Sequence, residues 1–102
     1  MGWATHYIDK LKKGETITFK APNGRSMQGR VEPRDIVTIE PVTDHTKLEE
    51  GDVVLCKVGK SQYLHLVTAV AGGRFQISNN KGHVNGWVGA NGIFGKLIRV
   101  GG

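Results

Sequence analysis

The pattern of hydrophobic and polar residues predicts one short helix followed by several strands. From Thr5 to Lys13, Ile8 and Leu11 lie three residues apart on one face, Thr5 can act as the N-cap, and Gly14 is a C-terminal stop. After Gly14 the hydrophobic period falls to two, which is typical of half-buried strands. Strands are predicted at Glu15–Lys20, Asp35–Glu40, Asp52–Val58, Gln62–Ala71, Arg74–Ser78 and Ile93–Val100.

Turn-forming residues separate these strands. Gly72-Gly73 is a two-residue hairpin signal, and residues 21–29, 43–51 and 79–92 are predicted loops. The loop at 79–92 is rich in glycine and asparagine and holds few apolar residues, so we expect it to be mobile. The fold class is therefore mostly β, as a single domain over residues 1–102 with a helical segment at 1–14 and a β core at 15–100.

Composition and charge narrow the classes of function. The 102 residues are 38% hydrophobic and carry a net charge of +5, which suits one domain with a compact core. The basic residues are dispersed and aromatic residues make up only 7%, so a nucleic-acid-binding surface is weakly supported. No apolar run has the length of a membrane span or a signal peptide. We expect a soluble, cytoplasmic protein with no membrane partner.

Metal and disulfide chemistry receive no support from the sequence. Cys56 is the one cysteine, so an intramolecular disulfide is impossible, and its apolar surroundings indicate a small buried side chain. The four histidines lack a spacing typical of metal ligands. We expect neither a metal ion nor another cofactor.

Four short motifs occur in an order that resembles the LexA/signal peptidase superfamily of serine peptidases. They are Gly24-Arg25-Ser26-Met27, Arg34-Asp35-Ile36-Val37, Gly51-Asp52-Val53-Val54 and Tyr63-Leu64-His65-Leu66-Val67. The resemblance covers roughly residues 20 to 100 and implies a coiled antiparallel β-sheet domain. The chain is similar to a bare catalytic core, of the kind found alone in phages, without a membrane anchor or a DNA-binding domain.

The resemblance implies that Ser26 is the nucleophile and His65 its general base. A serine hydroxyl needs a base within hydrogen-bond reach, and histidine titrates near neutrality. Gly24 and Arg25 form the turn before Ser26, whose N–H is a candidate oxyanion donor. Without the downstream motifs, Ser26 reads as an ordinary turn serine and His65 as a core histidine.

Strand alternation gives a second argument about His65. Leu64, Leu66 and Val70 form the more apolar face of their strand, which leaves Tyr63 and His65 facing a groove or solvent.

The chain departs from the family pattern at two places. Histidine-dependent members carry an acidic residue after the next strand, whereas this chain has Asn79 and Asn80, either of which can orient an imidazole. Arg34 replaces the glycine that usually precedes Asp35. His83 is a weaker candidate beside the predicted groove.

These residues support three hypotheses, in decreasing order. The first is a soluble serine endopeptidase that uses a Ser26–His65 dyad on an extended peptide segment bound by strand addition. The second is a catalytically inactive, peptidase-like module that holds a partner's strand, and the third is a basic nucleic-acid-binding β-barrel. The residues expected to line the substrate groove are Met27, Tyr63, Asn79, Asn80 and Trp87.

Overall fold

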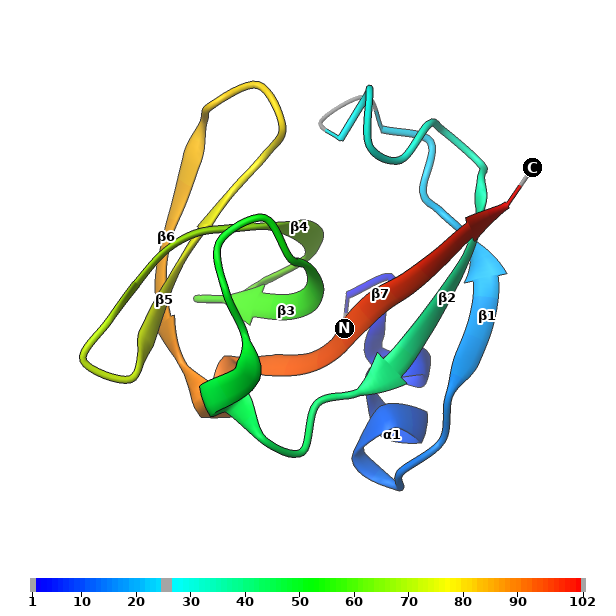
Figure 1. The fold of residues 1–102 in the computed structure, drawn as a ribbon. Helices are drawn as coiled ribbons and strands as arrows, with labels where there is room; N and C mark the ends of the chain where they lie inside the picture. Colours follow the sequence, from blue (N-terminus) through cyan, green and yellow to red (C-terminus); the bar gives the residue numbers. More distant parts are fainter. Residues whose placement is uncertain (1, 25–26, 102) are drawn as a thin grey trace.

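Seven antiparallel strands form one sheet in the computed structural model, which describes residues 2–24 and 27–101 (Figure 1). The sheet order is β1-β2-β7-β3-β4-β5-β6. The strands are β1 (Ile17–Lys20), β2 (Ile36–Pro41), β3 (Val53–Val58), β4 (Ser61–Ala71), β5 (Arg74–Ser78), β6 (Val84–Gly89) and β7 (Ile93–Gly101). One helix, α1 (Thr5–Lys12), and two 3-10 turns, at His45–Lys47 and Ala90–Gly92, complete the described elements. The prediction of a mostly β, antiparallel fold with one short helix is confirmed.

Two neighbouring strand pairs of the sheet are tight hairpins. β3 and β4 are joined through Gly59 and Lys60, and β4 and β5 through Gly72 and Gly73. Gly72 and Gly73 have φ values of 56° and 76°, the left-handed conformation that a two-residue hairpin of this twist requires and that glycine adopts without a steric penalty. The last strand, β7, enters the middle of the sheet between β2 and β3.

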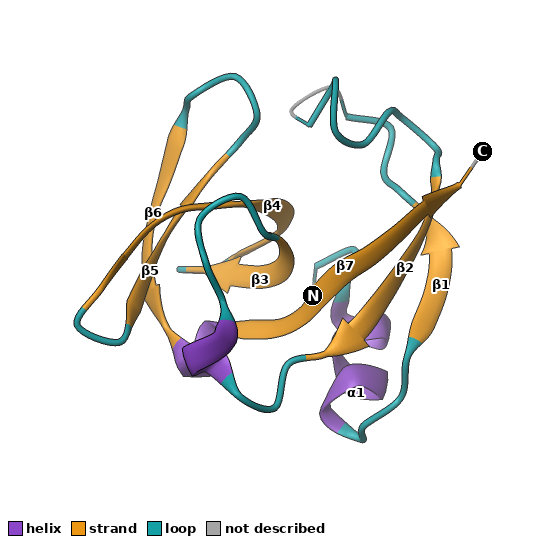
Figure 2. Cartoon of the chain, in the orientation of Figure 1, coloured by secondary structure: helices purple, strands orange, loops and turns teal. Residues whose placement is uncertain are grey.

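The sheet buries apolar side chains on both of its faces. Side chains alternate along β3, so Val53 and Leu55 join one hydrophobic cluster, whereas Val54 and Cys56 join the other. The first cluster includes α1, which packs against β1, β2 and β7 at one end of the sheet (Figure 2). The second lies between β3, β5, β6 and the start of β7. Cys56 is fully buried, as its apolar surroundings predict.

The N-terminal cap of α1 differs from the prediction. Ala4, not Thr5, is the N-cap residue, and it provides no side-chain hydrogen bond. Thr5 Oγ1 instead accepts a hydrogen bond from Gln62 Nε2 at 2.9 Å. At the other end, Gly14 follows the helix with φ 85°, as expected for a glycine that ends a helix.

Residues 84–89 form a strand where the sequence predicts a loop. β6 pairs with β5 over its whole length, from Arg74↔Gly89 to Ser78↔Val84. The strand is interrupted by a β-bulge, since Ile77 pairs with Gly86 whereas the next residue, Ser78, pairs with Val84. The alternation of apolar and polar residues is therefore broken at Asn85 and Gly86, and the segment resembles a loop in sequence.

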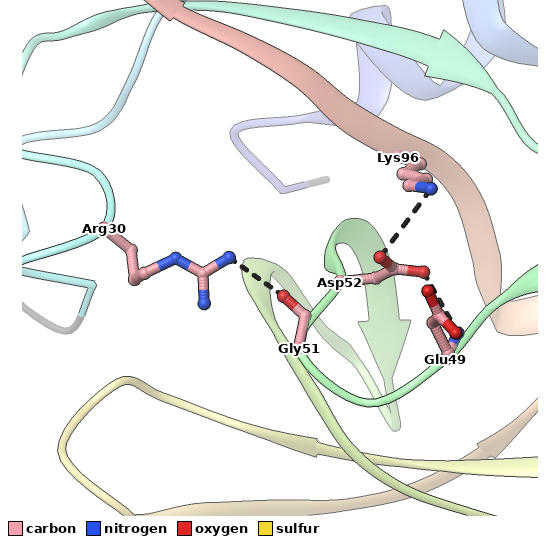
Figure 3. Close-up of polar contacts among 5 residues, drawn as sticks. All are labelled: Arg30, Glu49, Gly51, Asp52 and Lys96. Carbon is pink, nitrogen blue, oxygen red and sulfur yellow. Dashed lines mark hydrogen bonds and ion pairs between the residues drawn. The ribbon is translucent and has the colours of Figure 1, made fainter.

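A network of polar contacts holds the turn before β3 (Figure 3). Asp52 accepts a hydrogen bond from the backbone N–H of Glu49 at 3.0 Å and lies 3.7 Å from Lys96 Nζ of β7. Arg30 Nη2 donates to the backbone oxygen of Gly51 at 2.9 Å. The turn that begins β3 is thereby tied to the segment at residues 27–31, which is one wall of the candidate site.

None of the helices in the described part of the chain combines the length and the hydrophobicity needed to cross a membrane.

Candidate functional site

A cavity of about 140 Å³ lies between the first half of β4 and residues 21–24 and 27–32. Its volume is below the ~300 Å³ typical of pockets for drug-sized ligands, so it has room for one amino-acid side chain. Its wall is mostly apolar, with the carboxylate of Glu32, the phenol of Tyr63 and the imidazole of His65 as the ionisable groups. The lining residues are Trp3, Ala21, Pro22, Gly24, Met27, Val31, Glu32, Gln62, Tyr63, Leu64 and His65.

The residues on either side of the dipeptide that contains the predicted nucleophile line this cavity. Arg25 and Ser26 are outside the described residues, but Gly24 and Met27, which flank them, both line the cavity. Met27 is buried, and its backbone oxygen accepts hydrogen bonds from the N–H groups of Arg30 and Val31.

His65 reaches the same cavity from β4, where it pairs with Val54 of β3. Its side chain is only 6% exposed, and its ring stacks on Tyr63 with the centroids 4.6 Å apart. Strand alternation in the sequence predicts that this face of β4 is open and that Val70 is buried. The structure differs, because both faces of the sheet are packed and the β4–β5 register shifts between Val67 and Ala69, which leaves Val70 exposed.

Asn85 holds the imidazole of His65 in one orientation. His65 Nδ1 and Asn85 Oδ1 are 2.7 Å apart. A carboxamide oxygen is only an acceptor, so Nδ1 carries the proton, and Nε2 holds the lone pair that a general base uses. Asn85 is the extra residue of the β5–β6 bulge, and a bulge of this kind changes the direction of a side chain.

The surroundings of His65 favour its neutral form. Burial lowers the pKa of the imidazole below its ordinary value, and the nearby His83 lowers it further. The hydrogen bond to Asn85 acts in the opposite direction and raises the pKa, but burial has the larger effect. A neutral imidazole can accept a proton, which a general base requires.

The other predicted asparagines have different partners. Asn79 Oδ1 accepts hydrogen bonds from the backbone N–H groups of Lys81 and His83, and so shapes the β5–β6 loop. Asn80 Nδ2 donates to the backbone oxygen of Gln28 at 2.8 Å. The role of orienting the imidazole, which the sequence argument gave to Asn79 or Asn80, belongs to Asn85 in the structure.

Trp87 lies on β6, paired with Gln76, and is 41% exposed. It is not among the residues that line the cavity described above, nor are Asn79 and Asn80. Of the residues predicted to line a substrate groove, Met27 and Tyr63 line this cavity. Sequence reasoning missed Asn85 because it did not recognise β6. The β-forming residues Val84, Trp87 and Val88 were the available signal.

Among the strands of the described residues, none pairs with the edge of β4 that borders the cavity. Residues Ser61–His65 pair with β3, whereas the β4–β5 ladder begins only at Leu66. Peptide groups point to alternate edges of a strand. Since Ser61 closes the β3–β4 hairpin and points toward β3, the peptide groups of Gln62 and Leu64 point to the opposite edge, along which the cavity lies.

Other reactive chemistry is not assembled in the described part of the chain. No group of three or more His, Cys, Asp or Glu side chains that could hold a metal ion occurs among residues 2–24 and 27–101. Burial raises the pKa of Cys56 to about 12, so its thiol stays protonated and is a poor nucleophile.

Comparisons of the chain with models of protein families, with curated proteins and with solved structures find no match, so the site is interpreted from its own geometry and chemistry.

Proposed function

We propose that the chain is a serine endopeptidase of the LexA/signal peptidase type, with Ser26 as the nucleophile and His65 as the general base. The observation that carries the proposal is the cavity lined both by His65 and by the two neighbours of the Arg25-Ser26 dipeptide, Gly24 and Met27. The order of the sequence motifs is an independent argument for the same pair.

The proposed reaction follows from the orientation of His65. Ser26 Oγ attacks the carbonyl carbon of the peptide bond while its proton passes to His65 Nε2. The resulting imidazolium keeps its Nδ1–H on Asn85 and gives the Nε2 proton to the leaving amine, which departs as the C–N bond breaks. Water then attacks the acyl carbon while His65 Nε2 accepts its proton. His65 gives this proton to Ser26 Oγ as the bond between the acyl carbon and Oγ breaks, which releases the acid product and restores the serine hydroxyl.

Asn85 supports this chemistry less strongly than an aspartate would. A neutral amide fixes the tautomer and the ring orientation, but it contributes no negative charge to stabilise the imidazolium. We therefore expect slower turnover than in an otherwise equal site with a carboxylate at this position.

The substrate is an extended peptide that lies against the edge of β4. Strand addition would pair its main chain with the peptide group of Leu64, and one of its side chains would occupy the cavity. The family resemblance implies small residues next to the cleaved bond, which agrees with a cavity of about 140 Å³.

Labelling with a fluorophosphonate, which reacts with activated serines, tests the dyad. We expect the wild-type protein to be labelled at Ser26, and Ser26→Ala and His65→Gln to lose the label. Ser61→Ala, which alters an exposed serine on the same strand as His65, and His83→Gln are the matched controls and should keep it.

A second outcome would favour the inactive binding module. If the wild-type protein is folded and not labelled, yet binds alanine-rich peptides, the site holds a strand without cleaving it. If it is neither labelled nor able to bind peptides, both readings of the site fail.

A further inference from the structure

Trp3 covers part of the β4 edge that borders the candidate cavity. Its indole Nε1 donates a hydrogen bond to the backbone oxygen of Gln62 at 3.0 Å, and its side chain lines the cavity. The carbonyl of Gln62 points to the same edge as the peptide group of Leu64, two residues further along β4. A side chain from the N-terminal segment therefore occupies a position where a bound strand would continue.

The fold fixes Trp3 in this place. Gln62 Oε1 accepts a hydrogen bond from the backbone N–H of Ala4 at 2.7 Å, and Gln62 Nε2 donates to Thr5 Oγ1 at 2.9 Å. Ala4 is fully buried, and the Trp3 ring lies 6.1 Å from the ring of Phe19, centroid to centroid. Because the two residues that follow Trp3 are anchored by Gln62, the indole is held against the β4 edge even though it is 42% exposed.

We propose that Trp3 is a specificity-determining residue that ends the peptide-binding groove. A bound strand pairs with the peptide group of Leu64 and stops before Gln62, whose carbonyl already accepts the indole N–H. Substrate residues beyond this point gain no main-chain hydrogen bonds, so the site recognises a short segment. This proposal rests on the proposed function, because it concerns the same peptide groove.

The length of the bound peptide tests the role of Trp3. Acetylated and amidated alanine-rich peptides of increasing length serve as the probe, and their affinity is measured with a Ser26→Ala protein that cannot cleave them. We expect affinity to rise with length and then reach a limit. Adding Trp3→Ala should extend this limit by two residues, the spacing from Leu64 to Gln62, and strengthen the binding of longer peptides about tenfold, as expected for one or two added backbone hydrogen bonds.

Trp87→Ala is the matched control, since Trp87 is equally exposed but lies on β6 and does not line the cavity. It should leave the length limit unchanged. If Trp3→Ala does not fold, Trp3→Phe replaces it: the phenyl ring can still pack near Phe19 but has no N–H, so the Gln62 carbonyl is released and long peptides should bind about threefold more tightly.

The outcomes separate the two proposals. If peptides bind every variant and the length limit is the same in each, the role of Trp3 is wrong and the proposal of a peptide groove is retained. Peptides that bind none of the variants would overturn the groove itself, and with it the role of Trp3.

Discussion

Arg34 and Gly51 occupy the same position in two turns with the same hydrogen bonds. Each precedes an aspartate, Asp35 or Asp52, whose carboxylate accepts the backbone N–H of the residue three positions earlier, at 2.9 Å and 3.0 Å. Both have a left-handed backbone, with φ of 66° for Arg34 and 97° for Gly51. Glycine adopts this conformation freely, whereas a residue with a Cβ is strained in it.

Arg34→Gly should therefore stabilise the protein. Relief of the left-handed strain is worth ~1–2 kcal/mol, and the extra freedom of glycine in the unfolded chain removes roughly 0.4–1 kcal/mol of it. Arg34 is exposed, so little packing is lost. Urea unfolding should show a gain of about 0.8 kcal/mol, the difference between the midpoints of these two ranges. The reciprocal change, Gly51→Ala, should lower the free energy of unfolding. A loss of stability in Arg34→Gly would refute the explanation.

The stability of the fold should depend on pH through His65. The pKa of His65 is lowered in the folded state, chiefly by burial. At pH values between the folded pKa and the ordinary pKa of about 6.5, the unfolded chain therefore binds more protons than the folded chain does. The free energy of unfolding is then highest above about pH 6.5 and falls as the pH falls through this window. The slope for one proton is at most ~1.4 kcal/mol per pH unit. Denaturant unfolding of the wild type and of His65→Gln should differ in this slope; identical slopes would show that His65 does not titrate differently on folding.

Asn85 should control the pH dependence of the proposed serine reactivity. In the wild type, fluorophosphonate labelling should persist below about pH 6.5, because the base stays neutral there. Asn85→Asp places a carboxylate on Nδ1–H, which raises the pKa of His65 and moves the labelling midpoint to higher pH. Asn85→Ala removes the hydrogen bond that orients the ring and should slow labelling about tenfold. A midpoint that stays fixed in Asn85→Asp would contradict the contact seen between the two side chains.

Gly95 should tolerate no side chain. It is buried in β7 where α1 crosses the sheet, and a Cβ there would lie 2.5 Å from Ile39 Cγ2 and 2.9 Å from Leu11 Cδ1. Gly95→Ala should destabilise the fold by ~1–3 kcal/mol, the range for overpacked cores. Gly89→Ala is the control, because a Cβ at Gly89 would have no atom within 4 Å and the φ of this residue is not in the left-handed range. Thermal unfolding of the two variants makes the comparison, and equal transition temperatures would contradict it.

Local patterns in the sequence predict most elements but not their arrangement. The strands β2 to β5 are recognisable because their alternation and hairpin glycines are local signals. The insertion of β7 between β2 and β3 depends on pairings between residues far apart in the chain, which no local pattern encodes.

Some residues of the candidate site are predictable from the sequence, whereas others depend on the fold. His65 and Met27 were found from motif order, and both line the cavity. Asn85 was missed, since a bulge residue followed by Gly86 looks like a loop in sequence. Trp3 was missed because its position depends on its hydrogen bond to Gln62, 59 residues away.

The hydrogen bond from Asn80 to the backbone of Gln28 joins loops that belong to opposite ends of the sheet (Figure 1). The two residues are 52 positions apart, and closing such a long segment of chain is entropically costly. The walls of the cavity come from Trp3, from residues 21–24 and 27–32 and from β4, and its histidine is oriented by Asn85 of β6. We therefore expect the site to be completed late during folding, so that a partly folded chain lacks the proposed activity until β6 has joined the sheet.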